Sequence, residues 1–80
     1  MKPLTPIPMI EPMTLREKEV VELIMEGKCN KLIVRSLSIT ERTVKAHVSS
    51  ILRKMGLDSR YQVVAVINAL RSLINDYRRA

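Results

Sequence analysis

Basic and hydroxyl side chains between residues 41 and 55 have the spacing needed to bind bases and phosphates. At 100° per residue, one side of a helix here carries Arg42, Ala46, Ser49 and Arg53, with Lys45 and Ser50 at its edges. Arginine and lysine donate to phosphate oxygens or to the acceptor atoms of guanine, while serine can donate or accept. The pattern therefore predicts a helix whose outer face fits the major groove of duplex DNA.

The opposite side of the same helix is apolar and would hold it in place. Its apolar residues recur at intervals of three and four: Val44, Val48, Ile51, Leu52 and Met55. Just upstream, residues 30–37 have the pattern of a short helix, and only residues 38–40 separate the two. Two helices joined by so short a turn form a helix-turn-helix, and residues from about 41 to 55 are predicted to be its recognition helix.

Capping residues indicate two further helices. Thr14 and Glu17 fit a capping box at the start of a first helix, and Ser59 with Gln62 fits another at the start of a last helix that runs to about Tyr77. The chain has two glycines, and both stand where a predicted helix ends and a positive φ is needed: Gly27 and Gly56. No segment has the pattern of a strand, so we expect an all-α chain.

Three segments carry a resemblance to a known family: Leu15-Arg-Glu-Lys-Glu-Val20, Gly27-Lys-Cys-Asn-Lys-Leu-Ile33, and Ile39-Thr-Glu-Arg-Thr-Val-Lys-Ala-His47 continued by Lys54-Met-Gly-Leu57 and Ser59-Arg60. From about Met13 to Leu70 the chain resembles the LuxR-type, or GerE-like, helix-turn-helix domain of NarL/FixJ-type response regulators and quorum-sensing regulators. The resemblance implies a four-helix LuxR-type domain over 13–80, after a flexible Pro-rich arm or linker over 1–12. It also implies a sequence-specific duplex DNA-binding transcriptional regulator, or the effector domain of one.

The same resemblance assigns roles to individual residues. Base contacts are expected from Lys45, Ala46, Ser49 and Ser50. Phosphate contacts are expected from Lys31, Arg42, Thr43 and Arg53. Taken singly, a charge such as Arg53 or Lys54 fits a solvated helix face equally well.

The last predicted helix carries an apolar stripe longer than three short helices can cover. Its distal part consists of Leu70, Leu73, Ile74 and Tyr77. This part is either core or a dimer interface, and its heptad-like spacing favours the interface. The resemblance points the same way, because relatives commonly pair through this helix on DNA, and it adds RNA polymerase as a partner of the bound regulator.

Two residues depart from the family pattern at the start of the second helix. Cys29 stands where relatives usually carry a capping Ser or Thr, and Leu32 stands where they usually carry Glu, so both halves of a capping box are missing. We therefore expect this helix to be weakly capped. A redox role for Cys29 has no resolving cysteine to support it.

Composition limits the function classes. A net charge of +6 over 80 residues favours a polyanionic partner but does not by itself separate DNA from RNA or an anionic membrane. Two tyrosines as the only aromatics disfavour base stacking on RNA, and no apolar run is long enough for a membrane span. A single cysteine agrees with a reducing cytoplasm, where we expect the protein to be.

No residue pattern points to catalysis. Paired carboxylates, a nucleophile with its base, a Gly-rich phosphate loop and a metal cluster are all missing from the sequence, and a lone His47 is a poor metal candidate, so we expect no enzyme, no metal and no cofactor. The alternative to DNA binding is a protein-interaction module that keeps the helix-turn-helix as a scaffold and binds a partner through its last helix. The sequence fits both a stand-alone regulator and a fragment of a larger one.

Overall fold

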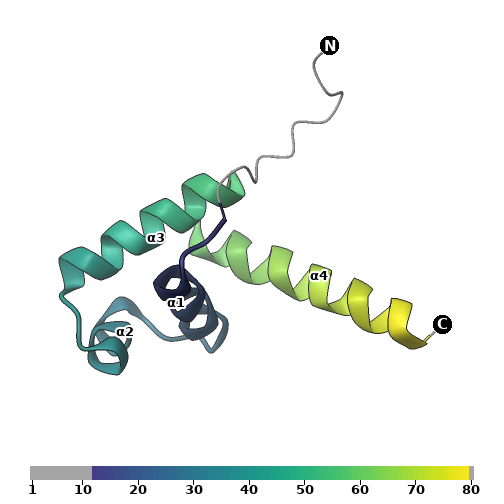
Figure 1. The fold of residues 1–80 in the computed structure, drawn as a ribbon, viewed down its shortest axis with the longest axis horizontal. Coiled ribbons are helices and arrows are strands. Elements are labelled where there is room, and N and C mark those ends of the chain that lie inside the picture. The colour runs from purple at the N-terminus through teal and green to yellow at the C-terminus, as the bar shows by residue number, and fades with distance from the viewer. Residues whose placement is uncertain (1–11, 80) are drawn as a thin grey trace, which may run out of the picture.

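The computed structural model describes residues 12–79, and this part of the chain is helical without any strand. Its four helices are α1 (Leu15–Met25), α2 (Asn30–Leu37), α3 (Glu41–Met55) and α4 (Arg60–Arg79), as Figure 1 shows. The predicted all-α, four-helix architecture is confirmed, and the recognition helix has the predicted bounds. The predicted arm over 1–12 lies outside the described residues except for Pro12.

The core lies where α1, α3 and the start of α4 meet. α2 packs against the first half of α3 (Figure 1). Seven apolar side chains are buried: Val20, Val21, Ile24, Ile33, Val44, Ile51 and Val63. The predicted apolar side of α3 is confirmed, because Val44 and Ile51 are fully buried and the other members of the stripe are partly buried against them. Burial of this stripe fixes which side of α3 remains exposed.

Local chemistry explains most helix ends. The Thr14 side chain accepts from the Glu17 N–H while the Glu17 side chain accepts from the Thr14 N–H, which is the predicted capping box. Gly27 and Gly56 adopt φ of 82° and 67°, as predicted for residues that follow a helix. Ser38 adopts φ of 55° at the end of α2, and no glycine marks this left-handed turn in the sequence.

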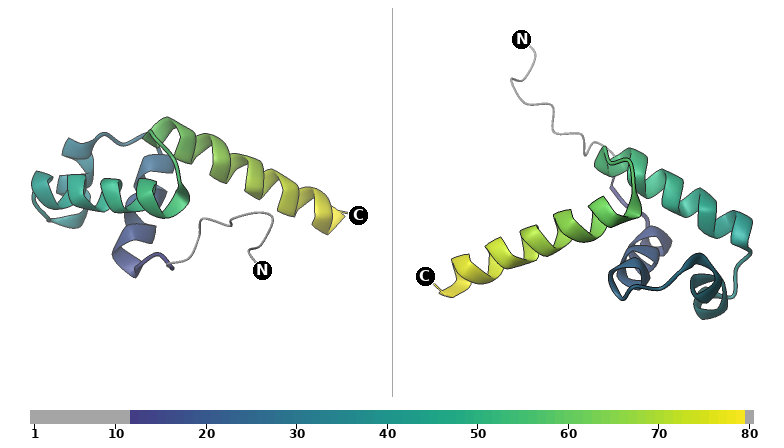
Figure 2. Two further views of the ribbon diagram at one scale, coloured as in Figure 1. Left: turned by 90° about the horizontal axis from the view of Figure 1, so that it is seen from above. Right: turned by 180° about the vertical axis from the view of Figure 1, so that it is seen from behind.

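The start of α4 is fixed by polar contacts to the rest of the domain. Gln62 accepts from the Ser59 N–H at 3.2 Å, and its own N–H donates to the Ser59 hydroxyl at 3.4 Å. Arg60 donates to the Asn30 side chain at 2.6 Å and to the Lys28 carbonyl at 2.8 Å, so α4 is tied to the turn before α2. The distal part of α4 extends away from the other helices, as both views in Figure 2 show.

Candidate nucleic-acid interface

The outer face of α3 combines basic and small side chains. α3 lies along one edge of the molecule, with α1 and α2 on its inner side (Figure 1). Its exposed residues include five of the predicted contacts, which we call the outer face of α3: Arg42, Lys45, Ala46, Ser49 and Arg53. The structure thus brings these five residues together on one helix, with side chains open to solvent.

The start of α3 is ordered by its own hydroxyl groups. Thr40 accepts from the Thr43 N–H at 3.2 Å, and the two hydroxyls share a hydrogen bond of 2.9 Å. Thr43 is half-buried, and its two hydrogen bonds with Thr40 fix its position. Lys45 Nζ lies 3.6 Å from Glu41 Oε1, and both side chains are 66% exposed. An exposed pair of this kind contributes about 0–1 kcal/mol, so Lys45 can exchange Glu41 for a base or phosphate at little cost.

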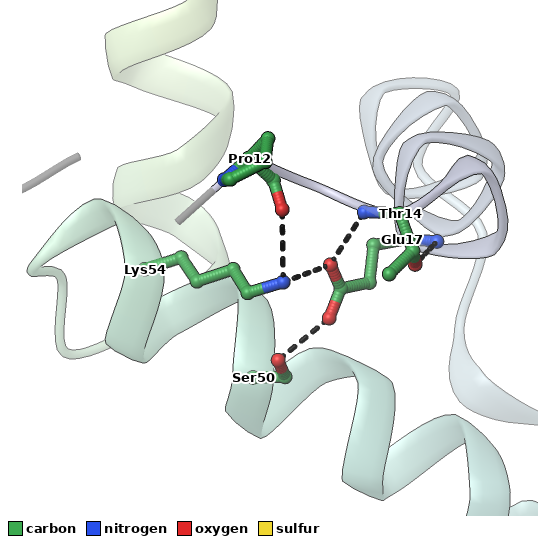
Figure 3. Close-up of polar contacts among 5 residues, drawn as sticks. All are labelled: Pro12, Thr14, Glu17, Ser50 and Lys54. Atoms are coloured by element: carbon green, nitrogen blue, oxygen red, sulfur yellow. Dashed lines mark hydrogen bonds and ion pairs between the residues drawn. The ribbon is translucent and has the colours of Figure 1, made fainter. Parts of the chain in front are cut away.

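Two polar residues of α3 point inward. Ser50 is half-buried, and its hydroxyl donates to Glu17 Oε2 at 2.6 Å (Figure 3). Because this hydroxyl is engaged with α1, the predicted base contact of Ser50 does not fit the structure. The interpretation of Lys54 as part of a solvated face is wrong, since Lys54 is only 8% exposed and its ammonium group lies 2.6 Å from Glu17 Oε1.

Glu17 is the centre of a buried polar cluster between α1 and α3. We define this cluster as the side chains of Glu17, Ser50 and Lys54 with the Thr14 N–H and the Pro12 carbonyl (Figure 3). Lys54 also donates to the Pro12 carbonyl at 3.2 Å, and the Thr14 N–H donates to Glu17 Oε1 at 2.9 Å. No buried side-chain nitrogen or oxygen of the described residues lacks a hydrogen-bond partner.

Burial and hydrogen bonding act in opposite directions on Glu17. Burial alone raises the pKa of this carboxyl, but the hydrogen bonds from Lys54, Ser50 and Thr14 outweigh it and lower the pKa from 4.5 to about 2. Glu17 and Lys54 therefore form an ion pair at neutral pH. The sequence offered one signal for this pair: Lys54 and Ser50 lie one turn apart on the flank of α3 next to its apolar side.

The α2 N-terminus bears the predicted Lys31 and the two departures from the family pattern. Lys31 is exposed in the first turn of α2. Cys29 is the N-cap residue, and its side chain forms no capping hydrogen bond, as expected. The nearby N–H of Leu32 lowers the pKa of this exposed thiol below its ordinary value. Leu32 itself is 40% exposed, so its side chain does not belong to the core.

The distal stripe of α4 is exposed. Leu70 is 53% exposed, Leu73 65%, Ile74 52% and Tyr77 85%. The alternative that these residues belong to the core is therefore excluded for the monomer. Next to Leu70 in the chain, Arg71 pairs with Glu22 of α1, and both side chains remain about half exposed.

Comparison with known proteins agrees with this architecture. Residues 11–67 match the family described as bacterial regulatory proteins, luxR family (GerE). The chain is 42% identical over 62 residues to the nitrate/nitrite response regulator protein NarL of Escherichia coli K12, covering 78% of the chain and 29% of NarL. It is 42% identical over 59 residues to the spore germination protein GerE of Bacillus subtilis, covering 74% of the chain and 77% of GerE. The transcriptional regulatory protein DegU of Brevibacillus brevis is 48% identical over 52 residues, which are 65% of the chain and 22% of DegU.

These matches and the four helices establish a helix-turn-helix domain of the kind that regulators use to bind DNA. The chain belongs to the luxR family of bacterial regulatory proteins. It spans less than a third of NarL and most of GerE. No helix among residues 12–79 is long and apolar enough to cross a membrane, and no three His, Cys, Asp or Glu side chains there are grouped so as to hold a metal ion.

Proposed function

We propose that this chain binds duplex DNA in a sequence-specific manner and thereby regulates transcription, with α3 in the major groove. The observation that carries the proposal is the outer face of α3, where basic and small side chains are exposed while the opposite side of the same helix is fixed in the core. A helix held in this way can enter the major groove without rearrangement of the domain.

The proposed contacts divide into base readers and phosphate anchors. Lys45 can donate to guanine O6 and N7, Ala46 is small enough to allow close approach and can contact a thymine methyl, and Ser49 can donate to or accept from a base. The phosphate anchors are Lys31, Arg42, Thr43 and Arg53. Ser50 is omitted because its hydroxyl is bound to Glu17. The base readers decide which sequence is bound, and the anchors supply affinity for any duplex.

We further infer a homodimer that pairs through α4, acts in the cytoplasm together with RNA polymerase, and has no catalytic activity. The exposed distal stripe supports the pairing, because Leu70, Leu73, Ile74 and Tyr77 would leave water in an α4–α4 interface. Two-fold symmetry in the protein then requires inverted half-sites in the operator. The same exposed stripe favours the second candidate function, a protein-interaction module, in which a different protein covers it.

Selection from random duplex DNA tests the proposed function directly. The 80-residue chain is immobilised, bound duplexes are amplified through several rounds, and the enriched sequences are aligned. The expected result is one sequence motif in two inverted copies. A Lys45→Ala, Ser49→Ala variant serves as the control, because it should retain duplexes without enriching that motif. Failure of the wild-type chain to enrich any sequence would favour the protein-interaction module.

A further inference from the structure

The buried polar cluster links the recognition helix to two other parts of the chain. Lys54 reaches both Glu17 on α1 and the Pro12 carbonyl just before it, and Ser50 reaches the second oxygen of Glu17 (Figure 3). None of these groups belongs to the outer face of α3. The proposed DNA contacts therefore leave the cluster without a role.

Stability alone is a poor explanation for such a cluster. Charged groups lose hydration when they are buried, and apolar side chains of similar size often stabilise a fold as well or better. What the cluster adds is a set of directional contacts between α1 and α3. Apolar contacts tolerate small rotations because they are not directional, whereas charge-assisted hydrogen bonds hold their atoms within a narrow range of distance and angle.

We propose that Glu17 and Lys54, assisted by Ser50, are positioning residues that set the rotation and tilt of α3 relative to α1 and to the backbone at Pro12. This inference rests on the proposed function, since it concerns how α3 is presented to DNA. Glu17 receives hydrogen bonds from two residues of α3 that are one turn apart. Two attachments on the same flank oppose both sliding of α3 along its axis and rotation about it.

The geometry of α3 carries this effect to the base readers. From Lys54 to Lys45 the helix rises about 14 Å at 1.5 Å per residue, so a small change of tilt at the cluster becomes a larger displacement at Lys45. Rotation of α3 about its axis would also turn Ser49 away from the base edges. Phosphate anchors on long side chains tolerate such shifts better, because they contact charge rather than a pattern of donors and acceptors.

The test replaces the ion pair with apolar side chains of similar length. In Glu17→Met with Lys54→Met, the net charge is unchanged and no buried charge is left unpaired. The binding constant is measured by fluorescence anisotropy on a labelled duplex that carries the motif selected by the wild-type chain, and on a random duplex of equal length. We expect a cooperatively folded variant whose Kd for the selected duplex rises at least tenfold, while its Kd for random duplex changes less than threefold.

The matched control is Arg16→Met with Glu19→Met. These two residues of α1 form an exposed ion pair of 3.5 Å and have no place in the proposed binding surface. Their replacement removes the same number of charges, and we expect both Kd values to stay within twofold of wild type. A loss of stability alone would leave both Kd values unchanged below the unfolding temperature. A rise in the ratio of the Kd for the selected duplex to the Kd for the random duplex therefore indicates a positioning effect and not a folding effect.

A second variant keeps the inference testable if the double methionine variant does not fold. Glu17→Asp retains the charge but shortens the side chain by one methylene, so α3 must shift to keep both hydrogen bonds. We expect a three- to tenfold weaker Kd for the selected duplex. Wild-type affinity in any folded cluster variant would overturn the positioning role and leave DNA binding intact. A wild-type chain that binds no duplex selectively would overturn the proposed function, and the positioning role with it.

Discussion

At the scale of single residues, the outer face of α3 separates side chains by what they can recognise. Lys45 is held only by an exposed contact to Glu41, so it is available to a base. Arg42 and Arg53 are also exposed, and their guanidinium groups can pair with any phosphate. Specificity and affinity should therefore respond to different substitutions, which gives this interface a residue-level test.

Lys45→Ala should relax the sequence preference. Loss of its donors is expected to cost about 1–3 kcal/mol on the selected duplex and to broaden one base position in each half-site. The measurement is repeated selection from random DNA with the variant. Arg42→Ala is the comparison: it should weaken selected and random duplexes alike and reduce the magnitude of the salt slope by roughly 1. An unchanged motif from the Lys45 variant would contradict its assignment as a base reader.

Glu17 makes the folding stability of the domain depend on pH. Its pKa is lowered from 4.5 to about 2 in the folded chain, so the unfolded carboxylate takes up a proton at a higher pH than the folded one. The stabilisation is complete above pH 4.5 and is lost as the pH falls toward 2, and it amounts to about 3 kcal/mol at the size of this shift.

Thermal unfolding followed by circular dichroism between pH 2 and pH 6 measures this dependence. The Glu17→Met, Lys54→Met variant should lose less stability over that interval than wild type, because it lacks the shifted carboxyl. The Arg16→Met, Glu19→Met variant should follow wild type closely. Identical acid profiles for wild type and the buried-pair variant would show that Glu17 does not carry the effect.

At the scale of helices, α2 is the weakly capped element. Cys29 leaves the first turn without a side-chain acceptor, and Leu32 occupies the position where a capping box needs Glu or Gln. The partial exposure of Leu32 means that a glutamate there would not be buried. α2 supports α3 through the buried side chain of Ile33. The cap at the start of α2 therefore affects the stability of the whole helix-turn-helix.

Cys29→Ser with Leu32→Glu should restore the capping box. The serine would accept from the first turn, and the glutamate would accept from the N-cap N–H, which together should stabilise the domain by about 0.5–2 kcal/mol. Urea unfolding of the double variant against wild type measures the difference. Cys29→Ala provides the control, since it removes the thiol without adding an acceptor. A double variant less stable than wild type would mean that Leu32 packs more usefully than its exposure suggests.

Helix pattern was predictable where it follows from neighbours in sequence. The apolar side of α3, the Thr14 cap and the glycines that end α1 and α3 all depend on residues within one or two turns. The buried ion pair was not predictable in the same way, because Lys54 meets Glu17 across 37 positions. The left-handed Ser38 was missed for another reason: serine has no marked preference for positive φ, so tertiary packing decides its conformation.

At the scale of the whole molecule, α4 makes the domain extended. Its distal half extends away from the other helices (Figure 2), and the apolar side chains there are exposed. A small domain gains little from leaving such a surface in water, which is why a second copy is the favoured occupant.

Leu70→Glu with Ile74→Glu should separate the proposed dimer. Four added charges would face each other across a two-fold interface, so we expect a folded monomer that binds one half-site weakly and loses the gain from linked half-sites. Sedimentation with and without DNA gives the assembly state, and circular dichroism gives the fold. Asn68→Glu with Ser72→Glu adds the same charge to the other side of α4 and should leave pairing intact. Paired-site affinity equal to wild type in the folded Leu70, Ile74 variant would remove the dimer.

In the proposed dimer, the contacts of Arg60 would limit the distance between the two domains. This side chain ties the base of α4 to Asn30 and to the Lys28 carbonyl, and we expect these contacts to hold α4 at a fixed angle to the helix-turn-helix. In a pair joined at the tips of α4, the separation of the two recognition helices would be a length built into the protein. Such a dimer would bind two correct half-sites only at the matching spacing, and loosening the contacts of Arg60 would make it tolerant of other spacings.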